Sequence, residues 1–406
     1  MNQGCSSTST PQNDTLSASH KSTAGEQILA NGEVVAANLF DPSPENEAAT
    51  LRNIDKLKGI GTRSIQADSG KSKPLERSAK SLGEVRFTVK RKDHDLDSYF
   101  AEYPIARMLV LKDGSVAYER YGLGNTEETR WTSMSIAKSV TSTLIGAAIK
   151  DGLILTVQDP VTKYLPELRD TVYKENTLQH LLQMSSGVKW DESTYTVSGD
   201  SEISRYFAPF NSGRSNAMMD LMKSIVRIAA PGVRGNYNTG DYFLLAKILS
   251  RVTHKTTSDY LSEKIWKPAG MERDGFWLLD APDGQELGGT SATLRDFGRL
   301  GQFILDEAPR IVPDGWFNEA TAPAFALDDD LYYGYGWKTG RSSDYSSPHA
   351  ILPFGHGGLY GQKLHIDPTR KMVIVQWGAF PPVAPDNDST TPWNAIREAI
   401  TQKIGW

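Results

Sequence analysis

The chain of 406 residues contains a single cysteine, Cys5. One cysteine excludes an intrachain disulfide framework and any zinc or iron–sulfur site built on cysteines. No apolar run approaches the roughly 18 residues that a membrane-spanning helix needs. The 35 glycines and 21 prolines are too few for a collagen-like or wholly disordered chain. These absences leave a globular protein, long enough for two or three domains of about 150 residues each.

Positive charge is not in excess either, because 44 lysines and arginines face 49 aspartates and glutamates. A chain of net charge −5 has no basic field, so nucleic acid is not an expected partner. The chain lacks the phosphate-binding Gly-x-x-x-x-Gly-Lys-Ser/Thr loop, the His-Glu-x-x-His metal motif and the Gly-x-Ser-x-Gly elbow of α/β-hydrolases. Its seven histidines show no metal-ligand spacing. No metal or organic cofactor is therefore implied.

The N-terminal part is poor in aromatic residues. Residues 1–30 contain none and are rich in polar residues, which predicts a disordered tail. Residues 31–82 predict an extended wrap over the surface, with one short helix near Ala48–Lys58. The stretch around Cys5 resembles the start of a mature bacterial lipoprotein. If a signal peptide was removed, the protein is periplasmic or lipid-anchored through Cys5; otherwise it is cytoplasmic.

Strand patterns occur at both ends of the ordered region, in residues 83–134 and 281–406. Two apolar stretches flank the turn Asp113-Gly114, which is a strong hairpin signal. Near the C-terminus, the turn Asp367-Pro368 joins two further strands. Residues 135–280 instead have mostly helical patterns, beginning with a helix at Ser135. The predicted fold class is α/β (α+β), with an antiparallel sheet flanked by helices and an inserted, mostly helical domain.

A Ser-x-x-Lys pattern occurs twice. The pair Ser186 and Lys189 straddles the helix stop at Gly187, which separates the two side chains. The pair Ser135 and Lys138 lies at a helix start, where a spacing of three places both side chains on one face. Lysine can activate a serine nucleophile if its pKa is lowered, and the helix N-terminus offers N–H groups to an oxyanion. A capping serine beside a surface lysine fits this position equally well.

The surrounding residues resemble the penicillin-recognising serine hydrolases, which include class C β-lactamases, DD-peptidases and related esterases. Five matching segments occur in the family's order: Trp131–Ser139 around the nucleophile, Leu178–Gly187, Tyr237-Asn238-Thr239 in place of Tyr-x-Asn, Gly288–Asp296, and His356-Gly357-Gly358 in place of Lys-Thr-Gly. Within this superfamily, three further segments are most similar to the 6-aminohexanoate-dimer (nylon-oligomer) hydrolases and their esterase relatives: Pro160–Leu168, Trp190–Tyr195 and Gly361–Pro368. The resemblance implies a β-lactamase/transpeptidase-like fold.

The resemblance also implies residue roles. Ser135 would be the nucleophile, Lys138 its base partner and Tyr237 a proton shuttle. The backbone N–H groups of Ser135 and Leu359 would form the oxyanion hole. Substrate would contact Tyr195, near the scissile group or leaving amine, and the segment His356, Gly357 and Gly358.

Two departures from the β-lactamase pattern point away from efficient lactam hydrolysis. Thr239 replaces an asparagine that holds a substrate amide, and His356 replaces the lysine that binds the lactam carboxylate. A literal Lys338-Thr339-Gly340 is also present, but a polar loop follows it, so we expect it to lie outside the motif position. We expect Asp191 and Glu192 to form a solvated loop; the other interpretation is an acidic patch that holds a substrate ammonium group.

The sequence thus predicts a serine hydrolase that cleaves small esters or linear amides through an acyl-enzyme on Ser135. A β-lactamase or DD-peptidase is the alternative within the enzymes. A non-catalytic peptidoglycan-binding relative is the alternative outside them. The expected partner is a small ester or amide substrate, without an integral membrane segment, and a homodimer is left open.

Overall fold

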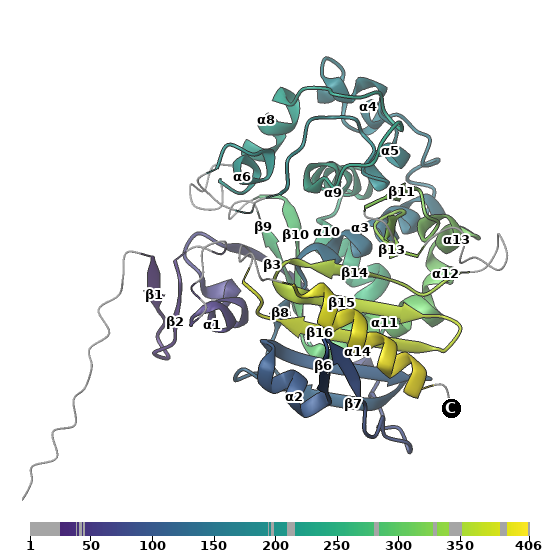
Figure 1. Cartoon of the computed structure of the whole chain (residues 1–406). Helices are drawn as coiled ribbons and strands as arrows, with labels where there is room; N and C mark the ends of the chain where they lie inside the picture. The colour runs from purple at the N-terminus through teal and green to yellow at the C-terminus, as the bar shows by residue number, and fades with distance from the viewer. Residues whose placement is uncertain are drawn as a thin grey trace, which may run out of the picture.

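The computed structural model describes residues 25–404, except 38, 40–42, 44, 194, 196–198, 209–215, 280–283, 328–330, 341–350 and 382–387. Cys5 and most of the expected tail therefore lie outside the described residues. Figure 1 shows a helical part above a large sheet, with the N-terminal elements to one side. None of the helices in the described ranges is long and apolar enough to cross a membrane.

The large sheet has eight antiparallel strands and draws on both ends of the chain, as the sequence predicts. Its order is β11-β12-β13-β14-β15-β16-β6-β7. The strands are β6 (Ile105–Lys112), β7 (Ser115–Tyr121), β11 (Phe325–Ala326), β12 (Tyr332–Tyr333), β13 (Lys338–Thr339), β14 (Phe354–Gly358), β15 (Gln362–Asp367) and β16 (Met372–Gly378). The predicted hairpin β6–β7 turns at Asp113 and Gly114, which have φ of 50° and 77°. Such positive φ values are what a tight two-residue hairpin requires.

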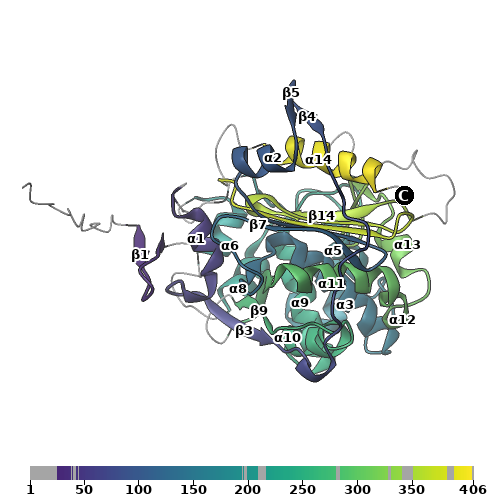
Figure 2. The same cartoon turned by 90° about the horizontal axis from the view of Figure 1, so that it is seen from below.

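Helices cover both faces of this sheet (Figure 2). On one face lie α2 (Leu96–Glu102) and α14 (Thr390–Lys403), and on the other lie α3 (Ala137–Lys150) and α11 (Leu294–Asp306). Alternate residues of β6 belong to different apolar clusters: Val110 shares one with Ile396 of α14, and Leu109 shares the other with Phe297 of α11. The sheet is therefore buried on both sides, which makes its central strands apolar along their whole length.

The helical part follows α3 along the chain. It comprises α4 (Val161–Tyr164), α5 (Leu178–Leu182), α6 (Glu202–Phe207), α8 (Ala217–Ser224), α9 (Thr239–Thr253) and α10 (Thr257–Leu261). A second antiparallel sheet lies beside α3 and has the order β3-β9-β10-β8, from β3 (Gly61–Ile65), β9 (Gly275–Leu279), β10 (Glu286–Ala292) and β8 (Trp131–Thr132). Further elements are the hairpin β4 (Phe87–Val89) and β5 (Lys92–His94), and the short helices α12 (Ala308–Ile311) and α13 (Trp316–Ala320).

Regular structure begins earlier than the sequence predicts. Strand β1 (Glu26–Ile28) lies within the expected tail and pairs with β2 (Val34–Ala36). The prediction of disorder through residue 30 is wrong here because strand pairing uses backbone hydrogen bonds and does not depend on aromatic side chains. The predicted short helix is present as α1 (Glu47–Arg52), followed by a 3₁₀ turn at Ile54–Lys56.

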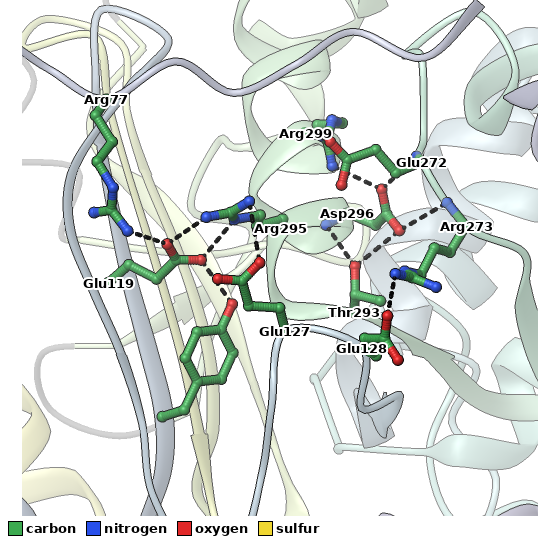
Figure 3. A network of polar contacts seen from close by, with 11 residues as sticks. Arg77, Glu119, Glu127, Glu128, Glu272, Arg273, Thr293, Arg295, Asp296 and Arg299 are labelled. Atoms are coloured by element: carbon green, nitrogen blue, oxygen red, sulfur yellow. Dashed lines mark hydrogen bonds and ion pairs between the residues drawn. The ribbon is translucent and has the colours of Figure 1, made fainter. Parts of the chain in front are cut away.

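A network of ion pairs joins the N-terminal wrap to the sheet domain (Figure 3). Glu119 of β7 accepts hydrogen bonds from Arg295 of α11 at 2.7 and 2.8 Å, from Tyr121 at 2.6 Å and from Arg77 at 3.2 Å. Burial opposes ionisation of Glu119, but the hydrogen bonds from Arg295 and Tyr121 hold its pKa below the usual value. The network fixes α11 against the edge strand of the sheet.

Candidate active site

The turn that carries Ser135 is held by the small sheet. A 3₁₀ turn at Met134–Ile136 leads into α3, and Met134 has a positive φ of 48°. The backbone N–H of Ser133 donates to the carbonyl of Thr290 at 2.7 Å, and the two hydroxyls lie 2.8 Å apart. Strand β10, which contains the predicted Gly-Gly segment, therefore supports the turn directly. Ser135 itself remains half-buried.

Lys138 lies in the first turn of α3 and contacts Ser135. Its Nζ donates to the Ser135 Oγ at 3.1 Å, and its side chain is only 3% exposed. Burial lowers the pKa of Lys138 to about 8; the charge of Glu192 opposes this shift and that of Lys338 adds to it. An appreciable share of Lys138 is therefore neutral near pH 8 and able to accept a proton.

Tyr237 completes a compact group with these two residues. It lies two positions before the start of α9, where Asn238 caps the helix by accepting from Asp241. The Lys138 Nζ is 5.0 Å from the centre of the Tyr237 ring. Burial raises the pKa of Tyr237 well above the usual value, and the charges of Tyr333 and Glu192 act in the same direction, against a hydrogen bond with Ser135. Tyr237 is therefore a neutral phenol that can donate or relay a proton.

The segment His356-Gly357-Gly358 lies on β14, which passes over the nucleophile turn. A Cβ atom at Gly358 would be 2.4 Å from the carbonyl oxygen of Ser133 and 3.1 Å from the nitrogen of Ser135. Only glycine permits this approach. Leu359 directly follows this glycine, at the end of β14.

His356 is buried beside Tyr237, with 6.3 Å between ring centres. Its Nδ1 lies 2.6 Å from the carbonyl oxygen of Gly357, so we assign the proton to Nδ1. Its Nε2 has no hydrogen-bond partner among the residues the structure describes. Burial lowers the pKa of His356 well below the usual value, and the charges of Lys338 and Lys138 add to this effect. His356 is therefore a neutral imidazole and does not replace the positive charge of a lysine.

Lys338 lies outside the motif position, as expected, but its side chain extends to the site. Its strand, β13, pairs with β14 and places Lys338 opposite Gly355. The Lys338 Nζ then lies 5.5 Å from the centre of the Tyr237 ring. The motif position next to Ser135 belongs to β14, but Lys338 still reaches the site. Strand β13 is only two residues long, too short to give a periodic pattern in the sequence.

Glu192 corrects one expectation from the sequence, because it does not lie in a solvated loop. Its Oε2 accepts from the indole N–H of Trp190 at 2.6 Å and from the backbone N–H of Thr239 at 2.9 Å. Its Oε1 accepts from the hydroxyls of Tyr195 and Thr239, each at 2.6 Å. The neighbouring Asp191 is exposed, and its carboxylate accepts from the N–H and the hydroxyl of Ser193. Glu192, for which the sequence predicts no catalytic role, thus connects Tyr195 to the start of α9.

A cavity of about 660 Å³ lies between α14 and strands β13, β14 and β15. Gly355 and Gly357 pair with His365 and Lys363, and side chains directly opposite on paired strands share a face, so the missing glycine side chains leave space there. Lys363 and Arg397 line the cavity, and neither forms an ion pair with another described residue. Burial lowers the pKa of Lys363 to about 7, with help from the charges of Lys338 and Arg397.

The second Ser-x-x-Lys pair is separated in the structure. Gly187 has a φ of 76° between the two residues. Ser186 is buried, whereas Lys189 forms an ion pair with Glu202 at 3.2 Å. This pair therefore lacks the contact that Ser135 and Lys138 make.

Comparison with known proteins agrees with this geometry. Residues 96–389 match the family model described as beta-lactamase. The 6-aminohexanoate-dimer hydrolase of Paenarthrobacter ureafaciens is 28% identical over 324 residues, which cover 75% of this chain and 79% of the relative. A solved structure from Bacillus anthracis, described as a 6-aminohexanoate-dimer hydrolase, superposes with a TM-score of 0.76 at 20% identity and covers 93% of this chain and 98% of its own.

A third relative shows the same fold in an enzyme of different description. EstCE1, a hydrolase with promiscuous acyltransferase activity, has a TM-score of 0.59 at 15% identity, and the match covers 75% of this chain and 96% of that one. These likenesses confirm the predicted β-lactamase-like fold. Since the family model spans well over half of the sequence, the chain belongs to the beta-lactamase family of serine hydrolases.

Proposed function

We propose that the protein cleaves small esters or linear amides through an acyl-enzyme on Ser135. The observation that carries this proposal is the 3.1 Å contact between the Lys138 Nζ and the Ser135 Oγ, with burial lowering the pKa of Lys138 to about 8. A serine hydroxyl needs an adjacent base to become a nucleophile. A non-catalytic binding protein has no need of this contact, so the geometry favours an enzyme.

The reaction starts when neutral Lys138 takes the proton of Ser135 and the Oγ attacks the substrate carbonyl. The backbone N–H groups of Ser135 and Leu359 stabilise the oxyanion that forms. The proton passes from Lys138 through Tyr237 to the leaving oxygen or nitrogen, and the carbon–heteroatom bond breaks. Water then attacks the acyl-enzyme, giving its proton through the same pair, and restores Ser135.

Two features favour esters and linear amides over β-lactams. Neutral His356 offers no charge to a lactam carboxylate at the position where β-lactamases use a lysine. Thr239 donates its hydroxyl to Glu192 at 2.6 Å, so that hydroxyl is not available to donate to the carbonyl of a substrate amide. A β-lactamase or DD-peptidase remains the alternative, which the experiment below distinguishes.

The charge of the cavity suggests one property of the substrate. Lys338, Lys363 and Arg397 line it, and the first of these also reaches Tyr237. Arg397 lies on α14, across the sheet from Ser135, whereas Lys338 extends to the Ser135 side, so a substrate with a carboxylate remote from the bond that is cleaved would place its charge near Lys338. A linear amide of an aminocarboxylic acid, like the dimer named for the Paenarthrobacter relative, has such a group.

The proposal is tested with a panel of three substrates: p-nitrophenyl acyl esters, linear 6-aminohexanoate oligomers and nitrocefin. We expect turnover of the esters, of the oligomers or of both, with nitrocefin far slower, and loss of all turnover in Ser135→Ala. Nitrocefin as the best substrate would favour a β-lactamase. Binding of peptidoglycan fragments without any turnover would favour the non-catalytic alternative.

A further inference from the structure

The cavity between α14 and strands β13, β14 and β15 lies on the opposite face of the sheet from the nucleophile. Figure 2 shows α14 on one side of this sheet and α3, which follows Ser135, on the other. Adjacent residues of a strand point to opposite faces. On β14, His356 accordingly lies beside Tyr237 in the active site, whereas Gly357 pairs with Lys363 of β15. Strand β14 therefore lies between the active site and the cavity.

Lys363 extends along the backbone of β14 into this cavity. A Cβ atom at Gly357 would lie 3.5 Å from the Lys363 Nζ, so the ammonium group lies directly over this glycine. Lys363 has no hydrogen bond or ion pair with any of the described residues. Burial and the charges of Lys338 and Arg397 lower its pKa to about 7. The protein thus holds this ammonium group in place without supplying a counter-ion.

Arg397 faces the same cavity from α14. Ile396 and Ile400 of this helix belong to the apolar cluster beneath it. A second face of the helix, with helical spacing, forms a polar stripe along the cavity: Thr390, Asn394, Arg397 and Thr401. Arg397, like Lys363, has no hydrogen-bond or ion-pair partner in the part of the chain that the structure describes. Two cations from different elements therefore converge on one space.

The other charged residues of the cavity do not neutralise this pair. Asp367 is already paired with Arg370 at 3.1 Å, and Glu398 is exposed and accepts from Gln402 at 3.1 Å. His365 is neutral, because burial lowers its pKa to about 3. The lining residues that carry charge are Lys338, Lys363, Arg370 and Arg397 against Asp367 and Glu398. The cavity therefore has an excess of positive charge, in a volume of about 660 Å³ that suits a small molecule.

Apolar side chains complete the wall. Trp393 lines the cavity from α14, Leu352 and Pro353 precede β14, and Leu331 precedes β12. A guanidinium has a planar fork that fits the two oxygens of a carboxylate, and an ammonium group adds a point charge. Apolar walls favour a ligand that also has a hydrocarbon part, which an inorganic anion lacks. The lining thus matches an anion with an aliphatic chain.

We propose that this cavity is a second binding site, which holds a small aliphatic carboxylate by contacts of its carboxylate with Arg397 and Lys363. The bound anion offsets the repulsion between the two cations and gives both of them hydrogen-bond acceptors. Carboxylic acids are also products of ester and amide hydrolysis. The inference does not rest on the proposed function, because binding is measured without turnover.

Isothermal titration calorimetry with hexanoate tests the proposal, and hexanamide is the neutral ligand of the same length. We expect saturable binding of hexanoate and binding of hexanamide that is weaker by about tenfold or more. Arg397→Met should weaken hexanoate binding by about tenfold or more, as the loss of a hydrogen bond between charged groups does. Arg397→Lys keeps the charge without the planar fork and should give an intermediate affinity.

Arg370→Met is the matched control for these variants. Arg370 also lines the cavity, but its guanidinium is paired with Asp367, so its loss should leave hexanoate affinity unchanged. Equal loss of affinity in Arg370→Met and Arg397→Met would show a general effect of charge and overturn the proposed contact. Equal affinity for hexanamide, or tighter binding of inorganic phosphate, would overturn the class of ligand.

The active site is a different place where a carboxylate can bind, near Lys338. The titration is therefore repeated on enzyme whose catalytic serine carries a phosphonate adduct, which fills the active site. Hexanoate should bind this adduct as tightly as the free enzyme, and loss of binding would overturn the proposal. The comparison of Arg397→Met with Arg370→Met needs neither the adduct nor turnover, so it stands even if the proposed function fails.

Thermal unfolding distinguishes binding from a structural role of the two cations. Neither Lys363 nor Arg397 pairs with a described residue, so Lys363→Met and Arg397→Met should unfold at the wild-type temperature or above it when no ligand is present. Hexanoate should raise the Tm of the wild type, because it binds the folded state, and should raise that of the two variants much less. A rise as large in the variants as in the wild type would overturn the proposal.

Discussion

Lys138 and Lys338 lie against the same aromatic ring, with their Nζ atoms 5.0 and 5.5 Å from the centre of Tyr237. Lys138 belongs to α3 and Lys338 to β13, 200 residues later in the sequence. Like charges disfavour each other's protonation, so Lys338 helps to keep Lys138 partly neutral. The charge of Glu192 acts in the opposite direction.

This pair of opposing charges predicts two pH shifts of opposite sign. The base must be neutral, so kcat/KM for an ester should rise with pH through the pKa of Lys138, near 8. Lys338→Met removes a positive charge, raises the pKa of Lys138 and should move the rising limb to higher pH. Glu192→Gln removes a negative charge and should move it to lower pH.

The groups near Lys138 from other elements include Tyr237, His356, Lys338 and Glu192. Tyr237 and His356 are both neutral in this pH range, because burial raises the pKa of Tyr237 and lowers that of His356. The rising limb therefore reports Lys138. Shifts of the same sign in both variants would show that another group controls it.

The close approach of β14 to the nucleophile turn predicts a sharp difference between two adjacent glycines. In Gly358→Ala, the new Cβ would lie 2.4 Å from the carbonyl oxygen of Ser133. The strand must move, which should lower the free energy of unfolding by about 1–3 kcal/mol and reduce kcat strongly.

Gly357→Ala is the control for this prediction, since the nearest atom to its Cβ would be 3.5 Å away. It should retain stability and most of the ester turnover. Thermal unfolding and ester kinetics of the two variants provide the comparison. Equal behaviour of the two would mean that β14 does not press against the Ser135 turn as the structure places it.

The position of Lys338 beside Tyr237 predicts a dependence on substrate charge. Lys338→Met should raise KM for an ester that ends in a carboxylate by about tenfold, the effect of roughly 1.4 kcal/mol. KM for the neutral ester of the same length should change little. Arg397→Met serves as a control, because Arg397 lines the cavity on the α14 side of the sheet. A rise in KM for both esters would show that Lys338 does not hold the anionic end.

The features that the sequence predicts correctly are those that depend on neighbouring residues in the chain. The hairpin at Asp113-Gly114 follows from the positive φ that glycine allows, and the contact of Lys138 with Ser135 follows from helical spacing. Neither feature depends on how distant parts of the chain pack. The family motifs extend this to β14, because the close approach at Gly358 needs a residue without a side chain.

Residues placed by long-range packing were missed. Glu192 depends on the N-terminus of α9, which lies 47 residues further along the chain. Lys338 depends on the pairing of a two-residue strand with β14. Lys363 and Arg397 share a cavity only because two glycines of β14 leave one face of the sheet open against α14. No short sequence window contains these relationships.

The identity of the nucleophile is the central claim, and covalent labelling tests it most directly. The enzyme is treated with a reactive phosphonate ester, digested, and the adduct is located by mass spectrometry. We predict a single adduct on Ser135, absent from Ser135→Ala and formed far more slowly in Lys138→Ala, because the contacting lysine activates the hydroxyl. An adduct on Ser186 or on any other residue, with Ser135 unmodified, would contradict the account.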